Sequence, residues 1–173
     1  MTEDRLKKIK MVLLDVDGVL TAGEIIYSDN GEQIKIFNVK DGVGIRLLKE
    51  AGFKVGIITG RKGRALHHRC INLGIDLIFE GVRHKDQVLD TVTAQTGISK
   101  EAMAYVGDDL PDLPVMKQVG LAVAVADAHE ILRQQAHIIT RARGGKGAVR
   151  ELSEAILKAQ GLWDGLINRL FDG

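Results

Sequence analysis

Short apolar runs alternate with helix-like segments along most of the chain, and this alternation constrains the fold more than any other feature. Each run is short enough to be a strand that is buried on both faces of a sheet. Strands are expected at residues 11–16, 54–59, 76–80, 102–109, 121–126 and 137–140. Helices are expected at residues 41–52, 63–74, 85–97, 113–119, 128–136 and 147–161. Repeated strand–helix units predict an α/β fold in which helices cover both faces of a parallel sheet.

Residues 24–39 depart from this pattern and read as a β-hairpin. Two β-rich stretches flank Asn30-Gly31, a pair that suits a type I′ turn. A lone hairpin cannot bury both of its faces, and exposed apolar surface of this kind marks an interface. We therefore expect an oligomer whose hairpins pack together; the alternative is a hairpin that folds down on its own core. The apolar side chains concerned are Ile25, Ile26, Tyr27, Ile34, Ile36 and Phe37.

Composition narrows the class of protein. The chain has 173 residues, 45% of them hydrophobic, which suits one domain over residues 1–173 with a full core. Its 24 basic and 23 acidic residues are nearly balanced, which argues against bulk nucleic-acid binding. A single cysteine, Cys70, excludes an internal disulfide and fits a reducing compartment. With no recognisable signal peptide or membrane span, we expect a cytoplasmic protein that ends in a loose amphipathic tail at 162–173.

Polar residues stand where the predicted strands stop. In open α/β sheets, ligands bind beyond the carboxyl ends of the strands. Polar side chains follow the first, second and fourth strands, and another opens the helix after the third. Any one of them alone is more often a turn, a cap or a surface residue, but together and in this order they predict one site. With Gly60, which lies between two of them, these residues are Asp15, Asp17, Thr59, Gly60, Arg61, Lys85, Asp108, Asp109 and Asp112.

Several carboxylates at one sheet edge would repel each other unless a cation joined them. Mg²⁺ prefers hard oxygen ligands, and Asp15 and Asp108 are good candidates. A phosphoryl group is then the natural substrate, because the cation offsets its charge and Lys85 and Thr59 can hold its oxygens. A carboxylate beside a bound phosphate can attack phosphorus and form an acyl phosphate. The second acid of the D-x-D pair, Asp17, can protonate the leaving alkoxide and then activate water.

These motifs resemble those of the haloacid dehalogenase-like superfamily. The matching segments are DVDGVLT at 15–21, ITGR at 58–61, Lys85, and GDDLPD at 107–112. The match is ordered, correctly spaced and covers nearly the whole chain. It implies a Rossmann-like three-layer sandwich with a parallel sheet and a β-hairpin flap after the first strand.

The same resemblance implies a role for each matched residue. Asp15 would be the nucleophile and Asp17 the general acid/base. Mg²⁺ would be held by Asp15, the main-chain carbonyl of Asp17, and Asp108. The phosphoryl group would be bound by Thr59, Gly60 and Lys85, and the metal ligands would be supported by Asp109 and Asp112.

The spacing of the motifs leaves no room for a cap domain. Only 41 residues separate Asp17 from Thr59, and 25 separate Thr59 from Lys85. The chain therefore resembles the uncapped members, and the open site would need cover from a large substrate or another subunit. Residues 13–61 and 144–152 further resemble a branch that hydrolyses an eight-carbon sugar acid phosphate in bacterial lipopolysaccharide synthesis. That branch implies a homotetramer with its hairpins assembled centrally.

Two departures from that branch concern the substrate. The chain has Ala22-Gly23 where the branch commonly has Asp-Gly, and Lys62-Gly63 where a small polar residue is common. Neither touches the phosphoryl chemistry. A phosphatase for a nine-carbon sugar acid or for a phosphoprotein therefore stays an alternative.

The glycine-rich segment 141–151 allows two interpretations. It lacks P-loop spacing, so it is either a flexible loop into the final helix or a mobile arm. The resemblance implies that this segment reaches toward the active site of a neighbouring subunit. Such an arm would bring Arg143 or Lys146 to a substrate carboxylate, although Arg61, next to Thr59, is the better candidate for substrate binding.

Two other classes of protein are disfavoured by the motifs. A phospho-accepting receiver domain would have its acceptor Asp after the third strand and its Lys last. Here that strand ends in IFEGVRHK with no Asp in the acceptor place, and Lys85 precedes the second acidic cluster. An idle relative that serves as a structural subunit would not be expected to keep all four motifs.

Overall fold

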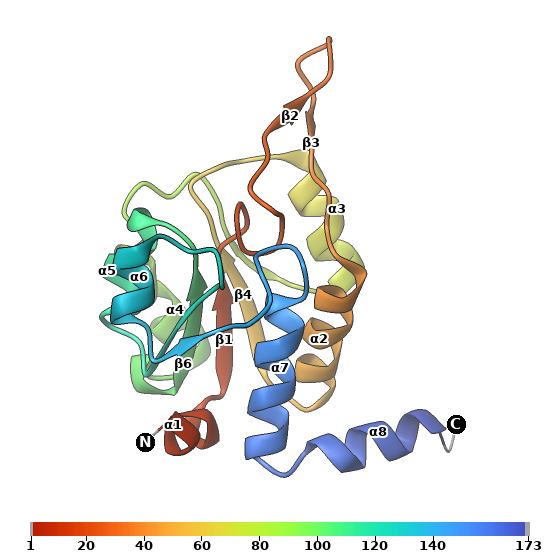
Figure 1. Ribbon diagram of the computed structural model, residues 1–173, viewed down its shortest axis with the longest axis vertical. Helices are drawn as coiled ribbons and strands as arrows, with labels where there is room; N and C mark the ends of the chain where they lie inside the picture. The colour runs from red at the N-terminus through yellow and green to blue at the C-terminus, as the bar shows by residue number, and fades with distance from the viewer. Residues whose placement is uncertain (1, 172–173) are drawn as a thin grey trace.

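The chain folds around one parallel sheet with helices on both faces (Figure 1). The computed structural model describes residues 2–171. The strand order β5-β4-β1-β6-β7-β8 confirms the predicted Rossmann-like α/β fold. The strands are β1 Met11–Leu14, β4 Lys54–Ile58, β5 Leu77–Phe79, β6 Met103–Gly107, β7 Leu121–Ala124 and β8 Ile138–Ile139.

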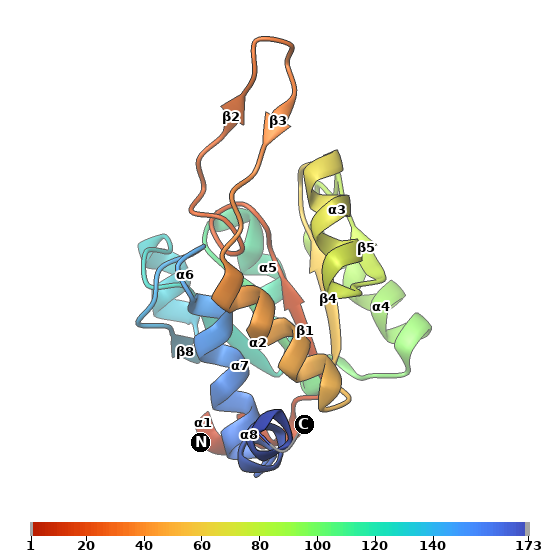
Figure 2. The same cartoon turned by 90° about the vertical axis from the view of Figure 1, so that its right-hand side faces the viewer.

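Helices form the two outer layers. Helices α2, α3 and α7 lie on one side of the sheet, and α4, α5 and α6 lie on the other (Figures 1 and 2). Their bounds are α2 Val39–Glu50, α3 Arg64–Leu73, α4 Val88–Thr96, α5 Leu113–Met116, α6 Glu130–Gln135 and α7 Ala148–Ala159. Short 3-10 turns are η1 Lys85–Gln87, η2 Lys100–Ala102 and η3 Leu110–Asp112. Each predicted helix is present, and α2 ends as expected just before Gly52, which has φ +90°.

The two ends of the described chain are helical, which was not predicted. Helix α1, Thr2–Lys8, buries Leu6. Helix α8, Trp163–Phe171, replaces most of the predicted loose tail; Leu166 is buried, and the indole of Trp163 lies under the cations of Arg150 and Lys158. Residues 172–173 of that tail lie outside the described residues.

The register of the central strands explains why the predicted residues meet. Strand β1 lies between β4 and β6, and Leu14 pairs with Ile57 on one side and Val106 on the other. The ladder continues one residue further, because the N–H of Asp15 donates to the carbonyl of Val106 at 3.1 Å. All six strands of this sheet run parallel, so the residues that follow β1, β4 and β6 emerge at the same edge of the sheet.

The predicted hairpin exists and projects away from the sheet (Figures 1 and 2). It pairs β2 Ile26–Tyr27 with β3 Gln33–Ile34 in antiparallel register. The predicted type I′ turn is wrong, because such a turn needs positive φ at Asn30 as well as Gly31, and among the described residues only glycines have positive φ. Instead the N–H of Gly31 (φ +78°) donates to the carbonyl of Ser28 at 2.9 Å.

The hairpin does not fold onto its own core. Five of its six large apolar side chains are exposed, with Tyr27 60% and Ile36 69% accessible, whereas Phe37 packs against the core. This excludes the alternative of a self-covered hairpin for those five side chains.

Two further expectations concern Cys70 and the membrane. Cys70 is a free thiol that packs in the core, and burial raises its pKa to about 11. Within residues 2–171 no helix has the length and apolarity that crossing a membrane requires.

Candidate active site

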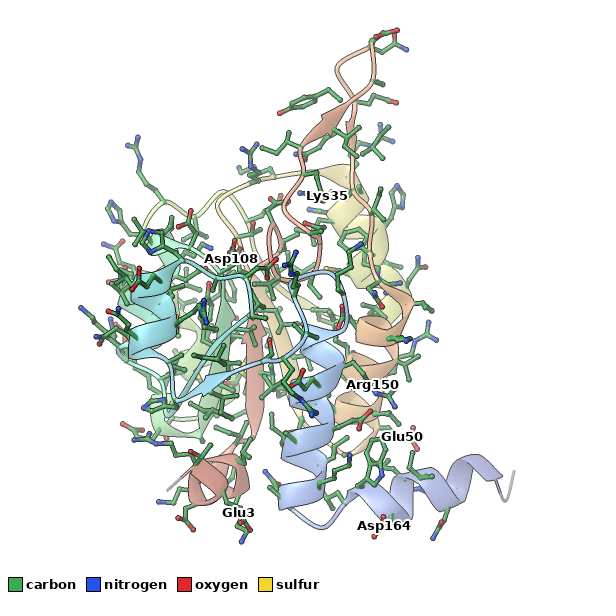
Figure 3. The ribbon with its side chains drawn as sticks, viewed as in Figure 1. Glu3, Lys35, Glu50, Asp108, Arg150 and Asp164 are labelled. Carbon is green, nitrogen blue, oxygen red and sulfur yellow. The ribbon has the colours of Figure 1, made fainter. Side chains whose placement is uncertain are left out.

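All the sequence-predicted site residues line one cavity at the carboxyl edge of the sheet. The cavity has a volume of about 680 Å³ and is open to solvent. In Figure 3, Asp108 lies at the upper end of the sheet and Lys35 lies above it on the hairpin. The predicted residues on its wall are Asp15, Asp17, Thr59, Gly60, Arg61, Lys85, Asp108, Asp109 and Asp112.

Asp15 and Lys85 form a buried ion pair at the floor of the cavity. Asp15 is 6% exposed and Lys85 is 5% exposed, and Lys85 Nζ lies 2.9 Å from Asp15 Oδ1. Burial and, next, the Asp112 carboxylate raise the pKa of Asp15 to about 6 against the opposing effect of Lys85. For Lys85, burial alone would lower the pKa, but the carboxylates of Asp15 and Asp112 leave it raised, so the lysine stays charged.

Three carboxyl groups converge in a way that favours a cation. One oxygen each of Asp15, Asp108 and Asp112 lies within 4.8 Å of the others. Burial, followed by the charges of Asp112 and Asp15, raises the pKa of Asp108 to about 8. These acids therefore resist ionising together, and a divalent cation with oxygen ligands would relieve that repulsion. The donor set thus fits Mg²⁺.

Both carboxylate oxygens of Asp112 accept hydrogen bonds from neighbouring groups of the chain. Asp112 therefore orients the residues around it in the site. Its Oδ1 accepts from Lys85 Nζ at 2.7 Å and from the buried Tyr105 hydroxyl at 2.6 Å. Its Oδ2 accepts from the backbone N–H of Asp108 at 2.9 Å and of Asp109 at 3.3 Å. Asp15 and Asp108 remain the carboxylates of the cluster with oxygens available to an ion.

Glycines make this close packing feasible. Gly18 has φ +88°, and a Cβ at that position would overlap the carboxylate of Asp108. A Cβ at Gly107 would overlap the side chain of Asp112. The glycines that follow or precede the acids in both motifs therefore allow the acidic cluster to close.

The second motif forms the opposite wall. The backbone of Thr59 extends β4, with its N–H donating to Phe79 O at 2.9 Å. The Thr59 hydroxyl accepts from the N–H of Arg61 at 3.4 Å. Arg61 is half-exposed, and its Nε lies 3.8 Å from Asp17 Oδ2. The Thr59 hydroxyl, the backbone of this segment and the Arg61 guanidinium therefore lie at the cavity wall.

Asp109 caps a turn at the rim. Its Oδ1 accepts from the N–H of Leu110 at 2.8 Å, and with Asp112 it forms a capping box on η3. It is exposed, so it supports the loop that carries Asp108 rather than the cluster itself.

Sequence reasoning missed Lys35 and Tyr105. Lys35 forms an ion pair with Asp17 Oδ1 although it is carried by the hairpin. Its only signal was a lysine between apolar residues in QIKIF, and nothing local shows that the hairpin stem returns to the site. Tyr105 is a polar aromatic in an otherwise small apolar strand, and its hydroxyl needs a partner when buried.

The glycine-rich segment is held against the loop that carries Asp17 and Gly18. Gly145 N–H donates to Val19 O at 2.8 Å, and Gly144 N–H donates to Asp127 Oδ1 at 3.0 Å. A Cβ at Gly144 would overlap the carbonyl of Gly18. On its own chain, the segment is therefore a brace behind the D-x-D loop.

The two basic side chains of that segment that were considered as substrate contacts do not line the chain's own site. Arg143 and Lys146 are exposed and are absent from the residues that line the cavity. The buried carboxylate of Asp41 holds the segment from the other side, accepting from the N–H groups of Gly147 at 3.2 Å and Arg150 at 2.9 Å. The segment is therefore hydrogen-bonded to its own chain on both sides, and its predicted flexibility stays a prediction.

Comparison with known proteins agrees with this geometry. A family model described as haloacid dehalogenase-like hydrolase matches residues 78–152. The 3-deoxy-D-manno-octulosonate 8-phosphate phosphatase KdsC of Escherichia coli K12 is 47% identical over 160 residues, which is 92% of this chain and 85% of that protein. The chain therefore belongs to the haloacid dehalogenase-like hydrolases, and it is a phosphoric monoester hydrolase.

Solved structures are similar over nearly the full length. The 3-deoxy-D-manno-octulosonate 8-phosphate phosphatase from Yersinia pestis superposes with a TM-score of 0.93 at 45% identity, covering 95% of this chain and 89% of that one. The enzyme of that name from Moraxella catarrhalis gives a TM-score of 0.95 at 40% identity, covering 98% and 97%. The latter was solved in complex with magnesium, phosphate and a KDO molecule.

Proposed function

We propose that this chain is a Mg²⁺-dependent phosphatase that hydrolyses 3-deoxy-D-manno-octulosonate 8-phosphate through an aspartyl-phosphate intermediate. The observation that carries this proposal is the buried Asp15–Lys85 pair beside Asp108, at the floor of an open cavity. The identity to phosphatases of that name, and the KDO, magnesium and phosphate in the Moraxella structure, support the substrate and the metal.

In this proposal Asp15 attacks phosphorus. Lys85 and Thr59, with the backbone at Gly60, hold the phosphoryl oxygens so that a carboxylate oxygen of Asp15 faces phosphorus opposite the leaving oxygen. Mg²⁺, held by Asp15, Asp108 and the main-chain carbonyl of Asp17, would offset charge on the phosphoryl group. The bond from phosphorus to the sugar oxygen breaks as the bond to Asp15 forms.

Asp17 transfers the protons of both steps. It gives a proton to the sugar oxygen as that oxygen leaves, and it takes a proton from the water that next attacks the phosphorus. The second attack releases phosphate and regenerates the Asp15 carboxylate. The place of Asp17 on the cavity wall, two residues after the nucleophile, suits both proton transfers.

Arg61 is the proposed contact for the sugar acid. Its side chain is half-exposed at the cavity wall, and a guanidinium binds a carboxylate through paired hydrogen bonds. The cavity of about 680 Å³ is large enough for a sugar phosphate, which would cover much of the uncapped site.

We further propose that the enzyme is a homotetramer that works in the cytoplasm in lipopolysaccharide synthesis. The exposed apolar hairpin supports an assembly in which hairpins pack together, since isolated apolar patches of this kind are rare on monomers. The names of the relatives support the pathway.

Phosphate release from a panel of phosphorylated sugars and sugar acids, with and without Mg²⁺, tests the proposal. We expect the eight-carbon sugar acid phosphate to give the highest kcat/KM, and Asp15→Asn to lose activity by at least about 10³-fold while keeping its fold. A higher kcat/KM for a nine-carbon sugar acid phosphate would mean that this compound, and not the eight-carbon one, is the substrate. Accumulation of phosphoprotein without turnover would instead indicate a signalling domain.

A further inference from the structure

We infer that Lys35, carried by the hairpin, positions the Asp17 carboxylate so that one chosen oxygen performs the proton transfers. This inference rests on the proposed function, in which Asp17 is the general acid and base. The side chain of Lys35 is only 3% exposed, and its ammonium is paired with Asp17 Oδ1. A lysine buried to this extent is rare unless it is paired, so the contact is a specific one.

The two oxygens of Asp17 have different surroundings. Oδ1 accepts from Lys35, whereas Oδ2 is buried and has no hydrogen-bond partner within residues 2–171. The guanidinium of Arg61 also lies near Oδ2, but its Nε is 3.8 Å away, beyond hydrogen-bond distance. A buried carboxylate oxygen without a partner is costly, and it is the atom that a substrate hydroxyl or water would satisfy. Oδ2 is therefore the oxygen that carries the proton.

Lys35 donates to Oδ1 in both steps. When Asp17 is protonated on Oδ2, its proton moves to the leaving oxygen as the bond from phosphorus to that oxygen breaks. When water attacks the phosphoryl group on Asp15, the water proton moves to Oδ2 as the bond from phosphorus to Asp15 breaks. Lys35 keeps its own protons throughout, so it is a positioning residue.

The backbone of the hairpin stem explains how Lys35 reaches the site. Successive side chains of an extended segment point in opposite directions, and the flanking Ile34 and Ile36 are 48% and 69% exposed while Lys35 points inward. A register shift of one residue would put an isoleucine against Asp17. The hairpin is therefore part of the catalytic machinery as well as an apolar surface.

A direct contact between Lys35 and substrate fits the structure less well. Lys35 is absent from the residues that line the cavity, and its ammonium is already paired with Asp17. Arg61 offers an exposed cation at the same wall, which suits a substrate carboxylate better.

The dependence of the rate on the leaving group tests this inference. Lys35→Met and Lys35→Arg are compared with wild type and with Lys40→Met, a control at a nearby exposed lysine. Each Mg²⁺-loaded protein is assayed on p-nitrophenyl phosphate, whose phenolate leaves without a proton, and on a neutral sugar phosphate, whose alkoxide needs one. Because kcat/KM reports the steps up to loss of the leaving group, it is the quantity compared.

We expect Lys35→Met to lower kcat/KM on the sugar phosphate by about 100-fold and on p-nitrophenyl phosphate by less than about 3-fold. Lys35→Arg should recover most of the loss, and Lys40→Met should match wild type. Circular dichroism and Tm establish that the variants fold; if Lys35→Met does not, Lys35→Gln replaces it.

Two results would overturn the inference. An equal loss on both substrates would mean that Lys35 supports the fold or the metal. Unchanged kcat/KM on both substrates, neither of which bears a carboxylate, would mean that Lys35 does not act in proton transfer to the leaving oxygen. The proposed function fails separately, because it requires wild-type hydrolysis of the eight-carbon substrate, which neither of these two assays uses.

Discussion

Asp108 has the most unusual environment of the residues in this site. Burial and the nearby carboxylates of Asp112 and Asp15 raise its pKa from 3.8 to about 8. Between these two values, the folded metal-free protein binds more protons than the unfolded chain. Its free energy of unfolding therefore falls as pH rises through this window. Asp15, with a pKa raised to about 6, adds to the same trend over a narrower window.

We therefore predict that the Tm of the protein in EDTA falls from about pH 5 to about pH 9. Asp108→Asn, which mimics the protonated acid, should reduce this slope and raise Tm at the alkaline end. Mg²⁺ should stabilise wild type most at alkaline pH and stabilise Asp108→Asn much less. Thermal unfolding across the pH range measures all three; an unchanged slope in Asp108→Asn would contradict the assignment.

Site residues were predictable where they follow an apolar strand in a recognisable order. Asp15, Thr59 and Asp108 meet because parallel strands end at one edge. Lys35 was not predictable, because its contact with Asp17 depends on where the hairpin stem folds back. The role of Asp112 in holding Lys85 and two backbone N–H groups likewise depends on three-dimensional geometry.

At the scale of elements, the brace formed by residues 144–147 links the catalytic loop to its neighbours. Asn38 Nδ2, at the start of α2, donates to Gly145 O at 3.2 Å, and Asp41 caps the N-terminus of α7. The brace thus connects the end of the hairpin with the loop that carries Asp17. Gly144 is the tightest contact, because no side chain fits between it and Gly18.

We predict that Gly144→Ala displaces the loop at Gly18 and lowers kcat by at least about 10-fold, with a stability loss of about 1–3 kcal/mol. Gly165→Ala is the matched control, since a Cβ there meets nothing within 4 Å. Steady-state kinetics and denaturant unfolding measure both effects. Full activity in Gly144→Ala would show that the brace does not position the loop.

The elements themselves were predicted well where apolar periodicity was strong. The observed strands end one or two residues before the predicted ones. In β1 this is because the apolar run continues past the ladder: Val16 is buried but lies beyond the strand. Helix α1 was missed because it buries only one apolar side chain, Leu6. The predicted turn type was wrong because Asn30-Gly31 is compatible with more than one hairpin loop. The loop is closed instead by the hydrogen bond from the Gly31 N–H to the Ser28 carbonyl.

At the scale of the whole molecule, the hairpin is the surface least suited to a monomer. It projects from the body in both ribbon views (Figures 1 and 2). Its apolar side chains are exposed. Packing of hairpins from several copies would bury that surface and wall the uncapped sites. The proposed assembly and the proposed catalysis therefore depend on the same segment.

We predict that Tyr27→Glu dissociates the proposed oligomer, because it places a charge in the hairpin surface that the assembly would bury. Ile131→Glu is the control, since Ile131 is also exposed, at 44%, but lies on α6 away from the hairpin. Light scattering at micromolar concentration should give about four chains for wild type and the control, and fewer for Tyr27→Glu. A monomeric wild type would remove the shared-site proposal.

The central claim is that the strand-end acids converge on a cation so that Asp15 can capture a phosphoryl group. A crystal structure with Mg²⁺ and beryllofluoride, which mimics a phosphoryl group on aspartate, tests it most directly. We predict beryllium bonded to Asp15, with a Mg²⁺ ion between the carboxylates of Asp15 and Asp108. Beryllofluoride bonded to another side chain, or Asp15 and Asp108 turned apart with no ion between them, would contradict the claim.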